Sequence, residues 1–107
     1  MKEIKNLNEY NEVISTDKPV LLDFYADWCG PCQVLLPTVE KLSNKYKDDV
    51  VVAKVNVDAN RELAQQYNVR SIPTIAILQN GEVIDRLVGL QTENQLRQKI
   101  ESLTVNF

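Results

Sequence analysis

The stretch that decides the fold runs from Pro19 to Leu36 and reads PVLLDFYADWCGPCQVLL. Its first seven residues are almost continuously apolar, which is typical of a strand covered on both faces of a sheet. Its last residues begin an apolar pattern with helical spacing. Cys29 and Cys32, the only two cysteines of the chain, lie between the two patterns. The stretch therefore predicts a strand-to-helix junction that carries a two-sulfur site.

Several uses of such a cysteine pair compete. A structural staple would close a very short loop, worth only roughly 2 kcal/mol before ring strain is subtracted. Zinc needs four ligands, and a chain with two cysteines and no histidine would need a second copy to supply them. Covalent haem requires a histidine directly after Cys32, where Gln33 stands. A reversible dithiol/disulfide fits the spacing best, with the staple and the shared metal site as alternatives.

Length and composition limit the remaining possibilities. A chain of 107 residues has room for one domain with one real core, so we expect residues 1–107 to form a single domain. The formal net charge of −3 argues against nucleic acid as the main partner. Residues 1–11 lack the apolar stretch of a secretory signal, and no apolar run approaches the ~20 residues of a membrane span. These features predict a cytoplasmic protein without a membrane partner, and in that reducing compartment a lone Cys-x-x-Cys is typically catalytic.

Strand patterns and helix patterns alternate along the rest of the chain. Residues 50–57 form a second almost continuously apolar segment, expected to lie centrally in the sheet with residues 19–25. Residues 74–78 and 83–88 flank Asn80-Gly81, a strong hairpin signal, so they should pair antiparallel at a sheet edge. A marginal first strand is expected to begin at Ile4.

Helical spacing appears between these strands. Asn60 and Thr92 are placed as N-caps, and Thr92 with Gln95 has the spacing of a capping box. The apolar faces of the four predicted helices consist of Tyr10, Val13 and Ile14; Val34, Leu35, Val39, Leu42 and Tyr46; Leu63, Ala64 and Tyr67; and Leu96, Ile100 and Leu103. The order β-α-β-α-β-α-β-β-α predicts an α/β fold with a parallel-containing sheet, and sites in such sheets form at the C-terminal edge of central strands.

The chain resembles the thioredoxin family. The resemblance covers the whole chain. It rests on the motif Trp28–Cys32, with Asp23 upstream and residues 72–74 (Ile-Pro-Thr), Gly81 and Gly89 downstream. It implies the thioredoxin fold: a central five-stranded mixed β-sheet flanked by four α-helices. It also implies thiol–disulfide exchange as the chemistry, with no metal and no cofactor bound to the chain itself.

The two cysteines should have different roles. A thiolate at a helix N-terminus is stabilised by unpaired N–H groups and the helix dipole, so Cys29 is expected to be the acidic, exposed nucleophile. Cys32, one turn inward, is the expected resolving thiol, which closes a Cys29–Cys32 disulfide. Pro31 lies in the first turn, where its missing N–H costs nothing. Gly30 and Pro31 place no charge between the sulfurs, which favours a donor of electrons over a disulfide inserter.

Two charged residues interrupt apolar strands. Asp23 is either a solvated carboxylate at a strand end or a buried group whose pKa is raised and which takes the proton from Cys32. Lys54 either reaches water as a snorkelling side chain or lies beside Asp23 on a neighbouring parallel strand. The resemblance favours the role of proton acceptor for Asp23 and of its partner for Lys54.

The resemblance also implies a docking surface. In this family the proline matching Pro73 is cis and faces the sulfurs, which would let the Ile72 backbone pair with an extended substrate segment. An indole N–H bond from Trp28 to Asp58 is also expected. The substrate-binding surface would consist of Trp28, Gly30, Pro31, Ile72, Pro73, Val88, Gly89 and Leu90.

These features predict a general protein-disulfide reductase and electron carrier. Its expected partners are disulfide-containing proteins and a flavoprotein thioredoxin reductase that draws on NADPH, and we expect it to be a monomer. The alternatives are a non-catalytic binding subunit with the same fold and a disulfide isomerase or oxidase.

Four residues depart from what is frequent in the family. Tyr25 replaces a tryptophan, Gln33 replaces a lysine or arginine, Asp27 adds a negative charge, and Leu90 stands where a smaller residue is common. Gln33 and Asp27 together make the surroundings of Cys29 less electropositive.

Overall fold

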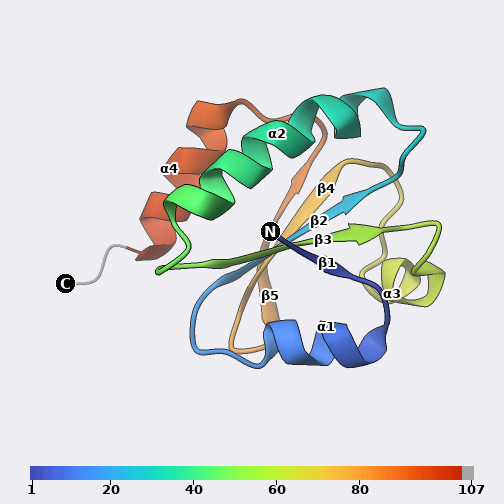
Figure 1. Ribbon diagram of the computed structural model, residues 1–107, viewed down its shortest axis with the longest axis horizontal. Helices are drawn as coiled ribbons and strands as arrows, with labels where there is room; N and C mark the ends of the chain where they lie inside the picture. The colour runs from blue at the N-terminus through green and yellow to red at the C-terminus, as the bar shows by residue number, and fades with distance from the viewer. Residues whose placement is uncertain (105–107) are drawn as a thin grey trace.

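The computed structural model describes residues 1–104 and shows a five-stranded sheet between two pairs of helices (Figure 1). Residues 105–107, the end of the expected domain, lie outside the described residues. The elements in chain order are β1 (Lys2–Ile4), α1 (Leu7–Ile14), β2 (Val20–Tyr25), α2 (Gly30–Lys45), β3 (Val51–Asn56), α3 (Arg61–Gln66), β4 (Thr74–Gln79), β5 (Glu82–Val88) and α4 (Glu93–Thr104). This is the predicted order.

The sheet has the strand order β1-β3-β2-β4-β5. The first three of these strands are parallel, whereas β4 runs antiparallel to β2 and β5 antiparallel to β4. The mixed sheet with β2 and β3 inside it confirms the predicted fold class. The first strand ends at Ile4 instead of beginning there, because the backbone of residues 2–4 pairs with residues 53–55 of β3. Ladder hydrogen bonds need no apolar side chains, so the apolar pattern placed this strand too late.

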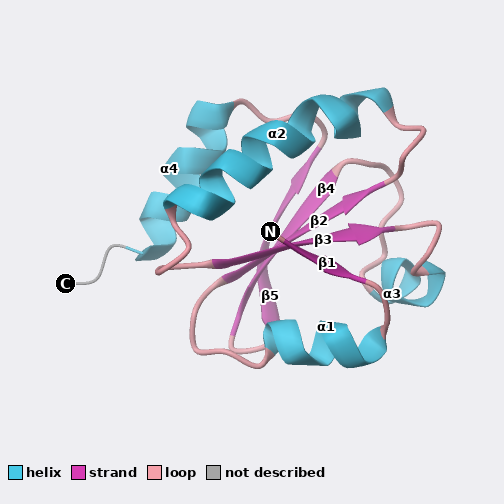
Figure 2. Ribbon diagram, viewed as in Figure 1, coloured by secondary structure: helices cyan, strands magenta, loops and turns pink. Residues whose placement is uncertain are grey.

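The two faces of the sheet carry different helices. In Figure 2, α2 and α4 cover one face, and α1 and α3 cover the other. Strand β2 is buried along its whole length, and alternate residues serve opposite faces. Leu22 and Phe24 belong to the core beneath α1 and α3, whereas Leu21 belongs to the core beneath α2. The continuous apolar run of β2 is thus explained by cover on both sides.

The local turn and cap signals have mixed outcomes. Asn80 and Gly81 have φ angles of 54° and 80° and form the two-residue loop between β4 and β5, as predicted. Thr92 and Gln95 exchange two side chain–backbone hydrogen bonds of 2.9 and 3.1 Å, which confirms the capping box. Asn60 stands at the N-cap of α3 but makes no side-chain cap bond. Its amide donates instead to the carbonyls of Ile4 and Asn56, so its bonds go to the preceding strands.

Within residues 1–104, no helix combines the length and apolar character that crossing a bilayer requires.

Candidate active site

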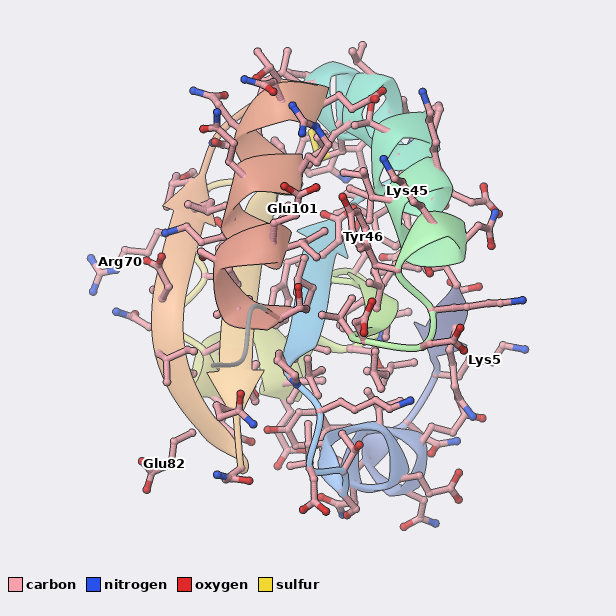
Figure 3. All side chains as sticks on the ribbon, turned by 90° about the vertical axis from the view of Figure 1, so that its left-hand side faces the viewer. Lys5, Lys45, Tyr46, Arg70, Glu82 and Glu101 are labelled. Atoms are coloured by element: carbon pink, nitrogen blue, oxygen red, sulfur yellow. A yellow bond between two sulfur atoms is a disulfide. The ribbon has the colours of Figure 1, made fainter. Side chains whose placement is uncertain are left out.

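The two sulfurs lie where β2 ends and α2 begins. Cys29 and Cys32 form a disulfide with a Cα–Cα distance of 5.2 Å, and Figure 3 shows the sulfur atoms at the start of α2. Cys29 is the N-cap of α2 in extended backbone conformation, and Gly30 and Pro31 occupy its first turn. The missing N–H of Pro31 therefore falls where a helix has no bond to lose, as predicted. The spacing of the motif places both sulfurs on this single turn.

The surroundings of Cys29 differ from those of Cys32 in exposure and in hydrogen bonding. Cys32 is fully buried, and Cys29 is 5% exposed. The prediction of an exposed Cys29 is therefore wrong for this disulfide form, because Ala26, Ile72 and the pair itself pack closely around it. The backbone N–H of Cys32 lies 3.2 Å from Cys29 Sγ and donates to it. After reduction, the same N–H can stabilise a thiolate at this position.

The backbone of the loop before β4 approaches Cys29. The carbonyl oxygen of Ile72 lies 3.8 Å from Cys29 Sγ, and the Ile72–Pro73 peptide bond is cis, as the resemblance implied. Among the described residues, no backbone hydrogen bond engages the N–H or the C=O of Ile72. The Gly89 N–H donates a hydrogen bond of 2.8 Å to the Pro73 carbonyl. Gly89 itself has a φ of +90°, a backbone conformation that favours glycine. The Gly89 bond thus holds the loop at Pro73, whereas the backbone of Ile72 has no backbone partner among the described residues.

Apolar side chains form the surface around this loop. Trp28 is 72% exposed, and its indole N–H donates to Asp58 Oδ2 at 2.8 Å, which confirms that expected pair. Val88 and Leu90 are more than half exposed at the end of β5. Trp28, Val57 and residues 69–72 line one pocket. Exposed apolar groups beside a disulfide are a surface that a partner protein can cover.

Asp23 is buried on β2, on the face of the sheet that α2 covers. It is 1% exposed, and neither carboxylate oxygen has a hydrogen-bond partner. Burial raises the pKa of Asp23 from the ordinary 3.8 to about 7, and the charge of Lys54 partly offsets this by lowering it. Of the two interpretations of Asp23, the buried carboxyl is therefore the one that holds. A group that titrates near neutral pH can accept a proton under physiological conditions.

Lys54 lies beside Asp23 on β3, as the parallel pairing predicted. The two residues are partners in the register of β2 and β3. The Lys54 ammonium lies 5.5 Å from the centre of the Tyr25 ring, and the residue is only partly exposed. Among the described ion pairs of 4.0 Å or less, none joins Lys54 to Asp23. Lys54 therefore influences Asp23 through its charge at a distance.

The sequence analysis missed two residues at this site. Glu3, on β1, accepts a hydrogen bond of 2.8 Å from the Tyr25 hydroxyl. Ala26 accepts a bond of 3.2 Å from the Gln33 amide, which ties α2 to the end of β2. A charge at position 3 gave no signal, because the first strand was expected to begin at Ile4. The register of a strand that short is visible only when the sheet is assembled.

Residues 1–104 contain no cluster of three or more Cys, His, Asp or Glu side chains placed to hold a metal ion.

Residues 2–102 match the family model described as Thioredoxin. The chain belongs to the thioredoxin family. Among curated relatives, the thioredoxin of Chlorobaculum thiosulfatiphilum is 43% identical over 99 residues, 92% of either chain, and that of Rickettsia prowazekii (strain Madrid E) is 46% identical over 86 residues, 80% of this chain and 82% of the relative.

Solved structures agree with this assignment. The structure of a mutant thioredoxin from Halobacterium salinarum NRC-1 superposes with a TM-score of 0.92 at 44% identity, covering 99% of this chain and 92% of the other. The family and the Cys29–Cys32 pair together make this thioredoxin-family member a dithiol/disulfide redox protein with thiol-disulfide oxidoreductase activity.

Proposed function

We propose that this protein is a general protein-disulfide reductase of the cytoplasm, built as one domain that acts as a monomer. An NADPH-dependent flavoprotein thioredoxin reductase recharges it after each cycle. The observation that carries the proposal is the Cys29–Cys32 disulfide at the start of α2, beside the unpaired backbone of Ile72. A substrate segment can therefore lie against the same loop that faces the nucleophile.

The first step is attack by Cys29. In the reduced protein, the Cys29 thiolate attacks one sulfur of the target disulfide, forms a mixed disulfide with it and releases the other target sulfur as a thiolate. The helix N-terminus and the Cys32 N–H stabilise the Cys29 thiolate before attack. Cys29 takes this role because it is the less deeply buried of the two sulfurs.

The second step is resolution by Cys32. The Cys32 thiolate attacks Cys29 Sγ, closes the Cys29–Cys32 disulfide and releases the second target thiolate, so the target has gained two electrons. Asp23 accepts the proton that Cys32 loses, and its raised pKa lets it do so near neutral pH. Lys54 supplies a positive charge that keeps the ionised Asp23 accessible in an apolar site.

Substrates and the reductase dock on one surface. This surface combines the exposed side chains of Trp28, Val88 and Leu90 with the backbone of Ile72 and Gly89. Gly30, Pro31 and Pro73 complete it around Cys29. Backbone pairing together with apolar contact discriminates little between target sequences, which suits a general reductase.

Trapping the mixed disulfide tests the order of attack. Cys32→Ser should accumulate a mixed disulfide between Cys29 and the target, because the resolving thiol is gone. Cys29→Ser should form no adduct and should not reduce insulin above the background rate. Mass spectrometry of the adducts provides the measurement, and an adduct on Cys32 in the Cys29→Ser protein would reverse the assignment.

Electron transfer from NADPH tests the direction of the reaction. With a bacterial thioredoxin reductase, NADPH and insulin, the parent protein should oxidise NADPH continuously, whereas the Cys29→Ser/Cys32→Ser protein should not. A reduction potential well above the cytosolic glutathione poise would instead indicate an oxidase or isomerase. A double variant that retained the biological role of the parent would indicate a binding subunit.

A further inference from the structure

A row of charged residues crosses the sheet beside the disulfide. Glu3 on β1 and Asp23 on β2 are both register partners of Lys54 on β3. Register partners point to the same face of a sheet, and neighbouring strands lie about 4.8 Å apart. Lys54 is therefore flanked by two carboxylates, one on each side, on the face that α2 and α4 cover.

Tyr25 contacts both Glu3 and Lys54 of this row. It lies two residues after Asp23 on β2 and so points to the same face. Its hydroxyl donates to Glu3 Oε2 at 2.8 Å, and its ring centre lies 5.5 Å from the Lys54 ammonium. An ammonium near an aromatic face is attracted to it, more strongly where water is partly excluded. Lys54 thus has an alternative to an ion pair with Asp23.

In this arrangement Asp23 forms no ion pair with the Lys54 ammonium. Both of its oxygens are buried and unpartnered, and Lys54 forms no ion pair within 4.0 Å of any carboxylate in residues 1–104. A long lysine side chain could reach a carboxylate on the adjacent strand, so its position over the Tyr25 ring needs a cause. Glu3 provides one, because it fixes the ring and places a second negative charge on the far side of Lys54.

We propose that Glu3 is a positioning residue for Asp23: it competes with Asp23 for the Lys54 ammonium and, through the Tyr25 hydroxyl, holds that ammonium against the Tyr25 ring. This inference rests on the proposed function, in which Asp23 accepts the proton of Cys32. Glu3 touches neither the sulfurs nor the substrate surface, so it acts only through Tyr25 and Lys54.

The competition has a direct consequence for proton transfer. An ammonium in contact with a carboxylate lowers the pKa of the carboxylate by about 1 to 3. Because Lys54 is held away from Asp23, the effect of burial on the pKa of Asp23 exceeds that of the lysine charge, and this pKa is about 7. A much more acidic Asp23 would be ionised throughout the physiological range but would be a poorer base. Glu3 therefore keeps the pKa of Asp23 high enough for Asp23 to act as a base toward the Cys32 thiol.

Other charged groups near Asp23 are few. Lys54 faces it from β3, and Tyr25, which packs in one cluster with Cys32 of α2, lies two residues on in its own strand. Its register partner on β4 is Ile75, and the buried face of α4 is formed by Leu96 and Ile100. The remaining buried residues of α2 are Leu35, Val39, Leu42 and Ser43. Glu3, one strand further than Lys54, is thus the second carboxylate of the row.

The titration of Asp23 in the intact oxidised protein tests the proposal, followed by the side-chain carboxyl carbon signal in NMR. Glu3→Gln removes the charge and leaves Lys54 to Asp23, so the midpoint of Asp23 should fall by about one pH unit. The matched control is Glu82→Gln, which removes one charge at the start of β5, the opposite edge of the sheet (Figure 3). The control should leave the midpoint unchanged.

Tyr25→Phe separates the charge of Glu3 from a loosening of β1. This variant removes the hydrogen bond to Glu3 but keeps the ring and the Glu3 charge, so Lys54 is still drawn away from Asp23. Its midpoint should fall by less than that of Glu3→Gln, because only the hold on the ring is lost and the charge of Glu3 still competes for Lys54. In a Lys54→Met background, Glu3→Gln should no longer lower the midpoint, because the ammonium for which the two carboxylates compete is absent.

Three results would overturn the proposal. They are an unchanged midpoint in Glu3→Gln, an equal fall in Glu3→Gln and Tyr25→Phe, and a fall that persists without Lys54. The pH profile of insulin reduction reports separately on the proposed function. If the acid limb of that profile follows the Asp23 midpoint, both ideas stand. If the midpoint moves and the profile does not, Glu3 still positions Lys54, but Asp23 is not the proton acceptor.

Discussion

The two faces of the sheet treat buried polar groups in opposite ways. Under α1, the hydroxyls of Tyr10 and Tyr67 lie 2.7 Å apart and satisfy one another, and their rings meet edge to face. Under α2, the carboxylate of Asp23 has no hydrogen-bond partner. Both sites are buried, and β2 contributes to both through alternate residues. A polar group can therefore be buried in this protein either with a partner or without one.

The difference separates a structural role from a chemical one. A satisfied pair such as Tyr10 and Tyr67 costs little to bury and helps to define the packing. An unpartnered carboxyl is costly once it ionises, but its pKa rises into the range where it can exchange protons. In the proposed mechanism, proton transfer near neutral pH needs the second arrangement, which is the one found at Asp23.

The largest loss of stability should follow from removing a large buried side chain from the core under α1. Phe24→Ala removes a fully buried ring that packs 5.2 Å from the Tyr67 ring, and should lower the free energy of unfolding by about 3–5 kcal/mol. Denaturant unfolding provides the measurement. The midpoint of the Asp23 titration in the folded protein should not change, and a shift of that midpoint would show that the two faces are coupled.

Asp23→Asn should act in the opposite direction on stability. The gap between a pKa of about 7 in the folded protein and the ordinary 3.8 corresponds to as much as roughly 4 kcal/mol. Because the folded pKa is the higher one, the parent protein is unaffected below pH ~4, loses stability as the pH rises to about 7 and shows the whole cost above that.

The variant should therefore resist denaturant better than the parent at pH 8 and equally well at pH ~4. Resolution of the mixed disulfide should slow, most visibly near and below neutral pH, where Cys32 seldom ionises unaided. Unfolding curves at both pH values and rapid-quench trapping of the mixed disulfide check the two halves. A variant less stable than the parent at pH 8 would contradict the first half, and parental resolution at pH 7 the second.

The tyrosine pair should show the cost of breaking a satisfied arrangement. Tyr10→Phe leaves the Tyr67 hydroxyl buried without a partner and should lower the free energy of unfolding by about 1–3 kcal/mol. Tyr10→Phe/Tyr67→Phe removes both hydroxyls and should recover much of that loss. The double-mutant cycle gives the coupling energy, and additive losses would show that the bond contributes nothing specific.

The smallest change in the free energy of unfolding is expected for the glycines that flank the two ends of β5. Gly89→Ala and Gly81→Ala both place a side chain at positive φ, +90° and +80°, and each should cost about 1–2 kcal/mol in unfolding. A Cβ meets no atom within 4 Å at either position, so the cost is conformational. Only Gly89→Ala should also raise the KM for insulin, because Gly89 holds the Pro73 loop. Equal KM values for the two variants would remove Gly89 from the docking surface.

Much of the fold was predictable because its signals are local. The apolar run of residues 19–25 and the Asn80-Gly81 turn predicted their elements correctly, since burial pattern and turn geometry depend on near neighbours. The first strand was wrong in detail, and Asn60 is the N-cap of α3 as predicted but makes no side-chain cap bond. In both cases a backbone or amide found a partner about 50 residues away, and no local pattern reports such a choice.

The sequence by itself determined the chemistry of this protein. A two-sulfur motif with one possible pairing, an uncharged Gly30-Pro31 between the sulfurs and a carboxylate in an apolar strand all follow from residue type and spacing. Only the tertiary structure decided the electrostatics. Asp23 has its raised pKa because the assembled layers exclude water, and Lys54 has its position because β1 brings Glu3 alongside β3. Charges interact through space, and distances in space are set only when strands distant in the chain pair with each other.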